Sequence, residues 1–197
     1  ERMRYIEHKG IATLVHNDHQ KSMKTVKYKK GLKVTHTRSL MFEIDKDRDF
    51  LLINAYMPTR GGKKGYNSRF EEAVDEILAI IKHNVTLKTS FLVAGDLNFC
   101  PWGHKLDKRR VKLMQKLVAE TGGKYLITKE PSHKSKSHEH SWSHLDGAIT
   151  SNDVEILEMR ILTPGDFPEA TKDHYPIKMD IKIASREIIS QQSSPLQ

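Results

Sequence analysis

The apolar run Ser90-Phe91-Leu92-Val93-Ala94 is followed at once by Gly95-Asp96-Leu97-Asn98. A short apolar run that ends in turn-forming residues predicts a buried β-strand. The carboxyl group of Asp96 and the amide of Asn98 then lie where a loop exposes side chains from a rigid base. We therefore predict that the end of this strand contributes to a functional site.

Two further segments place polar groups beside predicted strands. Leu145-Asp146-Gly147 begins a strand predicted at 145–150, and Lys172-Asp173-His174-Tyr175 leads into a strand predicted at 175–183. Three segments that are far apart in the sequence therefore share one kind of position, at or beside a strand end.

The remaining strands are predicted from β-branched and apolar runs separated by polar connectors. They cover residues 10–16, 39–44, 50–57 and 155–162. The lysine-rich stretch 29–33, with Gly31 at its centre, predicts a hairpin turn.

Two helices are predicted between these strands. Apolar residues at helical spacing predict one at 66–83, with Asn67 or Ser68 as its N-cap, and a second at 106–121 that stops at Gly122-Gly123. Strands outnumber helices, so the pattern favours an α/β sandwich in which two sheets pack together and helices cover the outside.

The composition indicates one domain with a basic surface. The chain has 197 residues, 37% of them hydrophobic, and a formal net charge of +8. We assign residues 1–184 to the domain and the polar residues 185–197 to a tail or linker. The charge favours a nucleic acid partner and a merely solubilising surface about equally.

The compartment is predicted from two absences in the sequence. No apolar run reaches membrane-spanning length, and the single cysteine, Cys100, excludes an internal disulfide. Both favour an intracellular protein without a membrane partner, with the nucleus as one candidate compartment.

Three motifs resemble those of the endonuclease/exonuclease/phosphatase superfamily, in the order and spacing of that family. Residues 93–98 resemble its GD(L/F)N motif, residues 145–149 its (I/L)DxI(F/I) strand and residues 172–177 its SDHxPI motif. Lys172 stands where the family usually has serine, and Ala148 displaces an apolar residue by one position. Neither departure touches a proposed catalytic group.

The resemblance covers about residues 10–183. Residues 54–58 are similar to the family's (N/A)xYxP strand end, and residues 10–15 to its GVAIL strand. The stretch 131–143 resembles the PT(R/H)…S segment that precedes the Asp146 strand in endonuclease domains of non-LTR retrotransposons. The implied fold is the deoxyribonuclease-like, four-layer sandwich, and the implied activity is metal-dependent DNA nicking.

By resemblance, Asp96 orients or deprotonates the attacking water, Asn98 donates a hydrogen bond to the scissile phosphate, and Tyr56 offers its hydroxyl to the same phosphate. For Tyr56, simple aromatic packing at a strand end is nearly as good an explanation.

The family also pairs its catalytic histidine, here His174, with a carboxylate that holds the imidazole in one tautomer. Either Asp146 or Asp173 is available, and we assign the partner as Asp146. That assignment leaves Asp173, with Asp96, as the ligands of Mg²⁺ or Mn²⁺, ions that prefer carboxylate oxygen.

Two family motifs that precede the GVAIL strand have no counterpart in the sequence: an asparagine on one strand and a glutamate on the next. Glu1 and Glu7 lie too close to Gly10 and follow no strand-like run. We therefore expect an N-terminally truncated domain with unpaired strand edges and a weakened metal site, inactive if the missing groups are not supplied from elsewhere.

The expected macromolecular partner is DNA. If the chain belongs to a retroelement, a reverse transcriptase domain is expected to follow it. Arg60, Lys63 and Lys64 in a glycine-rich loop are predicted to contact backbone phosphates. That loop lacks the GK(S/T) ending of a P-loop.

Other functions remain open. A phosphatase or small-substrate phosphodiesterase of the same superfamily, or a catalytically inactive nucleic-acid-binding module, would keep the same motifs. A zinc site is disfavoured because Cys100 and His104 lack further cysteines. We expect the histidines of the following loop to be solvated: His133, His138, His140 and His144.

Overall fold

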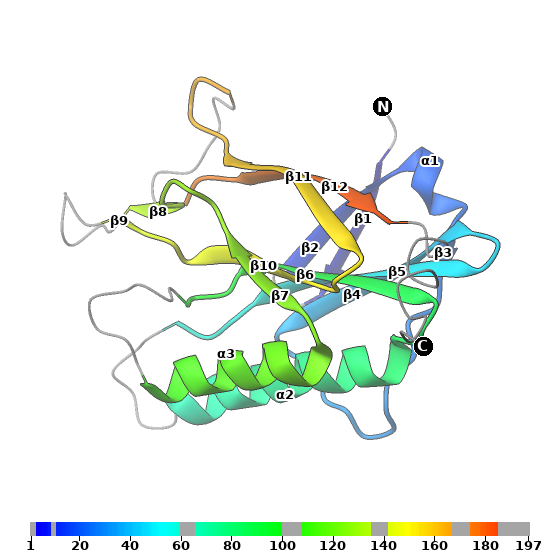
Figure 1. The fold of residues 1–197 in the computed structure, drawn as a ribbon, viewed down its shortest axis with the longest axis horizontal. Helices are drawn as coiled ribbons and strands as arrows, with labels where there is room; N and C mark the ends of the chain where they lie inside the picture. The colour runs from blue at the N-terminus through cyan, green and yellow to red at the C-terminus, as the bar shows by residue number, and fades with distance from the viewer. Residues whose placement is uncertain are drawn as a thin grey trace, which may run out of the picture.

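The computed structural model describes residues 3–8, 11–59, 66–99, 108–134, 142–166 and 174–184. Its strands are β1 (Met3–His8), β2 (Ile11–His16), β3 (Met23–Lys24), β4 (Thr37–Asp45), β5 (Arg48–Tyr56), β6 (Thr89–Asp96), β7 (Lys124–Ile127), β8 (His133–Lys134), β9 (Trp142–Ser143), β10 (Asp146–Thr150), β11 (Val154–Ile161) and β12 (Ile177–Ile183). Its helices are α1 (Asn17–Gln20), α2 (Tyr66–Asn84) and α3 (Lys108–Thr121). Figure 1 shows them as layers, with α2 and α3 on one face of a central sheet and β11–β12 on the other.

The central sheet has six strands in the order β3-β4-β5-β6-β10-β7. β5 and β6 run parallel, so both end at the same edge of the sheet, and the other neighbouring pairs are antiparallel. β10 begins at that edge, because it runs antiparallel to β6 with Asp146 opposite Asp96. Three strand ends from distant parts of the sequence therefore meet.

Side chains alternate between the two faces of the sheet, as in any β-strand. Leu51, Ile53, Phe91 and Val93 face the helices and are fully or almost fully buried against them. Helices α2 and α3 supply an apolar face at helical spacing, including Phe70, Val74, Ile77, Met114 and Leu117. This is the larger core of the molecule.

The opposite face of the sheet is covered by two strand pairs. β11–β12 packs on Phe50, Leu92 and Ala148, and β2 of the β1–β2 pair packs Val15 against Leu40. Each pair hydrogen-bonds as a ladder only within itself among the described residues. The predicted fold class, an α/β sandwich of packed sheets with helices outside, is confirmed.

Several local predictions differ from the structure. Residues before Gly10 do form a strand, β1, which the sequence did not predict because the charged Arg4 and Glu7 leave it with no continuous apolar run. Asn67 and Ser68, predicted as N-cap, lie within the first turn of α2. The turn at Gly31 exists, with Leu32 N donating to Lys29 O, but it lies inside the long connection between the paired strands β3 and β4 and does not join them as a tight hairpin turn.

No helix in the described parts of the chain is long and apolar enough to cross a membrane. The proposed tail, residues 185–197, lies outside the described residues. The division into domain and tail stays a prediction.

Candidate active site

The strand ends at one edge of the central sheet gather most of the residues singled out from the sequence. Tyr56 is the last residue of β5 and lies beside Asp96, the last residue of β6, which lies opposite Asp146 at the start of β10. Leu52, Leu92 and Ala148 lie an even number of residues away from these three along β5, β6 and β10, and they pack on the face away from the helices. Strict alternation therefore puts all three functional side chains on that face.

Gly95 allows the strands to approach each other just before Asp96. Its φ is +140°, and a Cβ built there would lie 2.1 Å from the carbonyl oxygen of Ala55 on β5. No other residue type fits both the backbone angle and the space. Glycine is therefore required at position 95 because β5 and β6 are in close contact there, next to the site.

His174 and Asp146 form a close pair. Nδ1 of His174 lies 3.0 Å from Oδ2 of Asp146, and because the carboxylate accepts, Nδ1 donates. This contact fixes the ring orientation and leaves the second ring nitrogen as the group for proton exchange. The side chain of His174 is one-third exposed and that of Asp146 is mostly buried.

Ser132 holds Asp146 from the other side. Its hydroxyl donates to Oδ2 of Asp146 at 2.7 Å and accepts from the backbone N–H of Asp146 at 3.2 Å. Its own carbonyl accepts from Tyr175 N at 2.8 Å, next to His174. Ser132 is fully buried, so this one residue ties both members of the pair to the β8 segment.

Asp96 differs electrostatically from Asp146. Burial, and then the charge of Asp146, raise the pKa of Asp96 from 3.8 to about 6, while hydrogen bonds from Asn98 and the nearby His174 act in the opposite direction. A carboxyl group with a pKa near 6 accepts protons near neutral pH more readily than an ordinary aspartate.

Asn98 turns inward in this structure. Its backbone N–H donates to Oδ1 of Asp96 at 3.0 Å, and its Nδ2 donates to the carbonyl of Met57 at 2.8 Å. It adopts a positive φ of 45°, which asparagine tolerates better than most residues. Its contact with a phosphate stays a prediction, whereas Tyr56, 52% exposed, is accessible from solvent.

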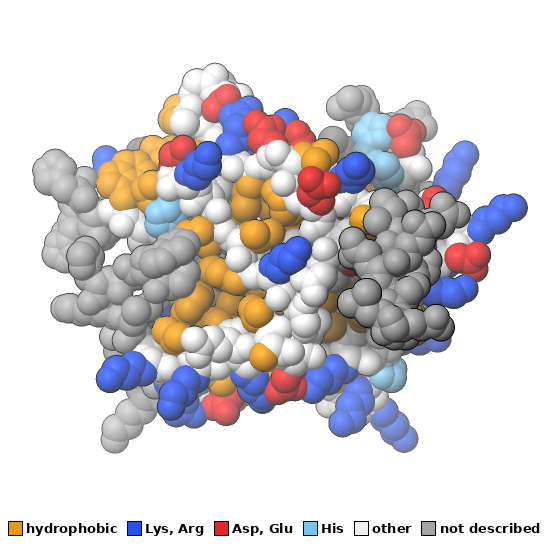
Figure 2. All heavy atoms as spheres, in the orientation of Figure 1, with side chains coloured by type: hydrophobic (Ala, Val, Ile, Leu, Met, Phe, Trp, Pro, Cys, Tyr) orange, Lys and Arg blue, Asp and Glu red, His pale blue; other side chains and the backbone are white. Residues whose placement is uncertain are grey.

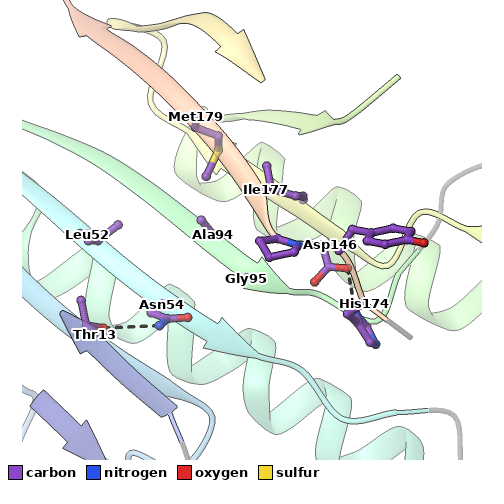
Figure 3. Close-up of a pocket in the computed structure, with 12 residues that line it drawn as sticks. Thr13, Leu52, Asn54, Ala94, Gly95, Asp146, His174, Ile177 and Met179 are labelled. Carbon is purple, nitrogen blue, oxygen red and sulfur yellow. Dashed lines mark hydrogen bonds and ion pairs between the residues drawn. The ribbon is translucent and has the colours of Figure 1, made fainter. Parts of the chain in front are cut away.

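A cleft of about 430 Å³ leads away from the Asp146–His174 pair, between β2 and β12. Figure 3 shows Asn54 bonded to Thr13 at one end and His174 bonded to Asp146 at the other. Leu52, Ala94 and Gly95 contribute to its floor. The pair therefore lies at the end of an open cleft and not in the sealed core.

Aromatic rings next to His174 make a second contact surface. The ring of His133 lies 4.6 Å from that of His174, and its Nδ1 is 3.0 Å from Ser143 Oγ. Trp142 stacks on Tyr175 at 5.7 Å and is 43% exposed. His133, expected to be a solvated loop histidine, instead packs against the predicted catalytic ring.

The sequence did not single out Ser132 or His133 as site residues. The one signal was the family-like stretch that begins at Pro131. Their role depends on β8 being bridged to residue 174, a contact that no local pattern predicts.

Several predicted site residues lie outside the described residues: Asp173, Arg60, Lys63, Lys64, Cys100, His104, His138 and His140. Their proposed roles in metal or DNA binding stay predictions. Within the described residues, no three histidine, cysteine, aspartate or glutamate side chains form a group that would hold a metal ion.

The two carboxylates at the site, Asp96 and Asp146, nevertheless are the kind of ligand that binds Mg²⁺. Mg²⁺ is commonly held by one or two carboxylates and keeps several waters. Asp96 faces Asp146 across two paired strands, and a cation near them would offset the burial and the charge of Asp146 that raise the pKa of Asp96. Oδ2 of Asp146 is engaged by His174 and Ser132, and Oδ1 of Asp96 by the Asn98 N–H, so each carboxylate has a second oxygen with which it could bind the ion.

The chain matches no protein-family model and no curated protein. It is similar in structure to the endonuclease domain of TRAS1, a telomere-specific non-LTR retrotransposon, with a TM-score of 0.61 and 16% identity over 92% of this chain and 78% of that domain. It is also similar to the 3′ phosphatase NExo from Neisseria, bound to a product DNA hairpin (TM-score 0.53, 12% identity, 74% of this chain and 65% of that one). An AP endonuclease from Archaeoglobus fulgidus gives a TM-score of 0.53 at 11% identity, with the same coverage.

Of several other solved structures that it matches, the chain spans only 38% to 64%. Identities this low carry information about the fold and not about substrate or partner. The layers, the order of the motifs and these likenesses together show that the chain has the fold of the endonuclease/exonuclease/phosphatase superfamily.

Proposed function

We propose that this chain is a phosphodiester hydrolase domain that cleaves one strand of DNA. The observation that carries the proposal is the Asp146–His174 pair beside Asp96, on the same sheet face and at the end of an open cleft. Nearby donors and acceptors of protons are what hydrolysis of a phosphodiester requires.

Asp96 receives the proton of the attacking water. In the metal-free protein its pKa is raised to about 6, so the group is still mostly ionised at neutral pH and can accept a proton. Asn98 holds the Asp96 carboxyl group through its backbone N–H, which limits the rotation of that group.

His174 contacts the phosphate and, from its second ring nitrogen, gives a proton to the leaving oxygen as the P–O bond to that oxygen breaks. The Asp146 carboxylate stabilises the imidazolium form and, with Ser132 behind it, restrains the ring. Tyr56 reaches the same phosphate from the end of β5, where its side chain is exposed.

Mg²⁺ or Mn²⁺ is the proposed cofactor, held by Asp96 and Asp173. When bound, such an ion would neutralise charge on the phosphate oxygens and polarise the ester. Addition of Mg²⁺ should lower the pKa of the Asp96 carboxyl group measured by ¹³C NMR. An unchanged titration at millimolar Mg²⁺ would exclude Asp96 as a ligand.

DNA is favoured as the substrate by charge and by the neighbours. The net charge is +8, and lysine and arginine side chains line the helical layer in Figure 2. Some of them are paired with carboxylates, as Lys116 is with Asp75, so only part of this charge is available to phosphates. Two structural neighbours are named as endonucleases, and a third is bound to a DNA product.

The finer assignment is to a retroelement. The neighbour with 92% coverage of this chain comes from a non-LTR retrotransposon, and the motifs resemble those of the same group. A reverse transcriptase domain on the same polypeptide and residence in the nucleus go with that assignment.

The test is nicking of supercoiled plasmid in the presence of Mg²⁺, by the wild-type protein and by Asp96→Ala and His174→Ala. We expect open-circular product from the wild type and losses of at least about 100-fold in both variants. Equal cleavage by all three proteins would refute the site. Turnover of mononucleotides or inositol phosphates without nicking would indicate a small-substrate phosphoesterase, and binding without cleavage a non-catalytic module.

A further inference from the structure

Arg110, on α3, is a buried charge beside the candidate site. Only 5% of the residue is exposed, although it lies in a helix rich in exposed basic residues. Burial of a guanidinium is costly unless hydrogen bonds replace its water. The partners of the Arg110 hydrogen bonds therefore indicate what the buried guanidinium does.

The guanidinium donates to two backbone carbonyls. Nη1 donates to the carbonyl of Asn98 and Nη2 to that of Pro58, each at 2.7 Å. The same group lies 4.1 Å from the centre of the Phe70 ring on α2, which adds a cation–π contact. Arg110 thus connects both helices to two loops.

These two loops are the ones that follow the catalytic strand ends. Pro58 comes two residues after Tyr56 on β5, and Asn98 two residues after Asp96 on β6. The loops are also joined directly, by Met57 N to Asp96 O at 2.8 Å and by Asn98 Nδ2 to Met57 O. The arginine fork lies behind this junction on the helical side.

We infer that Arg110 is a positioning residue for the proposed hydrolysis, acting by clamping the loops after β5 and β6 at a fixed separation and so setting the placement of Tyr56 and Asp96. The inference rests on the proposed function for its kinetic consequence. Arg110 itself touches no substrate, because it packs on the face of the sheet that carries the helices.

The geometry requires arginine and not merely a positive charge. A planar guanidinium presents N–H groups in a rigid fork that reaches two acceptors at once. A lysine ammonium is a point charge on a flexible stem, so it serves one carbonyl well and leaves the other weakly bonded. Methionine keeps the packing on Phe70 and leaves both carbonyls without these donors.

The experiment compares Arg110→Met and Arg110→Lys with Asn84→Ala in the nicking assay. Asn84 is the matched control, because it is also buried and bonds backbone carbonyls of Lys27 and Ile80, but at the far end of α2. We expect Arg110→Met to lower kcat by about 10- to 100-fold with KM for DNA unchanged, since misplacement by about 1 Å costs that much. The kcat of Arg110→Lys should lie between those of the wild type and Arg110→Met. Asn84→Ala should lower Tm and leave kcat unchanged.

A second readout does not need activity. Order parameters from ¹⁵N relaxation should fall at Met57, Leu97 and Asn98 in Arg110→Met and stay unchanged there in Asn84→Ala. Wild-type kcat in Arg110→Met, or losses that follow Tm equally in both variants, would overturn the positioning role. If the wild-type chain does not nick DNA, the proposed function fails, and unchanged order parameters in Arg110→Met would then overturn the clamp as well.

Discussion

Two carboxyl groups lie opposite each other at the end of the central sheet, and their surroundings make them different. Asp146 is held by Ser132 and His174, whereas Asp96 receives a hydrogen bond from the Asn98 backbone and has a pKa raised to about 6. Pairs of carboxyl groups with unequal surroundings are how proteins separate an orienting group from a proton acceptor. The difference has measurable consequences for stability and rate.

Asp96→Asn should stabilise the metal-free protein at neutral pH. Well below pH 3.8 Asp96 is protonated in both the folded and unfolded states, so its ionisation has no effect on stability there. Between about pH 4 and pH 6 the unfolded chain loses the proton first, and the wild-type protein loses stability as the pH rises.

The difference in unfolding free energy between Asp96→Asn and the wild type should therefore grow over that range and level off above it. Its size should be on the order of 1–2 kcal/mol, since the group is partly solvent-screened. Urea titrations from pH 4 to pH 8 in EDTA measure it, and parallel pH profiles for the two proteins would show that the pKa is not raised.

Ser132→Ala should weaken both the fold and the reaction. The Asp146 carboxylate and backbone N–H each lose a buried partner, which costs about 1–3 kcal/mol of unfolding free energy. Nicking should slow by about 10-fold, as is typical when the partner behind a catalytic group is removed. The control is Ser22→Ala, which removes an exposed hydroxyl that donates to the carbonyl of His19, and equal effects of the two changes would contradict this role.

At the scale of elements, the alternation of side chains along β5, β6 and β10 places the site residues on one face of the sheet. The close approach of β5 to β6 depends on Gly95.

The helix at 66–83 and the strand at 50–57 were predicted nearly as found, because long runs with a clear hydrophobic period predict their own secondary structure. β8 and β9 have two residues each and carry no periodicity, so only their tertiary partners define them. Ser132, beside β8, was missed for the same reason, while Asp96, Asp146 and His174 were found because they lie in motifs.

Gly95→Ala should destabilise the protein more than Gly31→Ala. Both glycines have a positive φ, but a Cβ at Gly95 meets the Ala55 carbonyl at 2.1 Å, whereas nothing lies within 4 Å of one at Gly31. We expect a loss of about 3 kcal/mol or more at Gly95, from strain plus displacement of β5, and about 1 kcal/mol at Gly31. Urea denaturation of both variants measures the two losses of unfolding free energy. Equal losses would mean that the close contact between β5 and β6 at Gly95 adds no cost to the substitution.

At the scale of the molecule, the two faces of the central sheet differ in how they are covered. The helical face holds one large core, while the other face carries two strand pairs with separate ladders among the described residues. A sandwich of this class was predictable from the order of strands and helices. The division into two strand pairs was not, because it depends on which edges pair in space.

The two faces should therefore open separately. Amides of β5 and β6 should exchange slowest, and those of β1–β2 should exchange by a smaller, partial unfolding. Leu40→Ala, which removes a contact with Val15, should speed exchange in β1–β2 more than in β6. Hydrogen-exchange mass spectrometry resolves the segments, and equal protection throughout would indicate one cooperative unit.

The central claim is that Asp146 and His174 act as one unit in phosphodiester hydrolysis. The most direct measurement is the Mg²⁺-dependent nicking rate of four proteins: the wild type, Asp146→Asn, His174→Ala and the double variant. We expect wild-type nicking, a large loss in each single variant, and a double variant no slower than His174→Ala, because groups that act together lose their effect together. Losses that multiply in the double variant, or nicking that survives both substitutions, would contradict the claim.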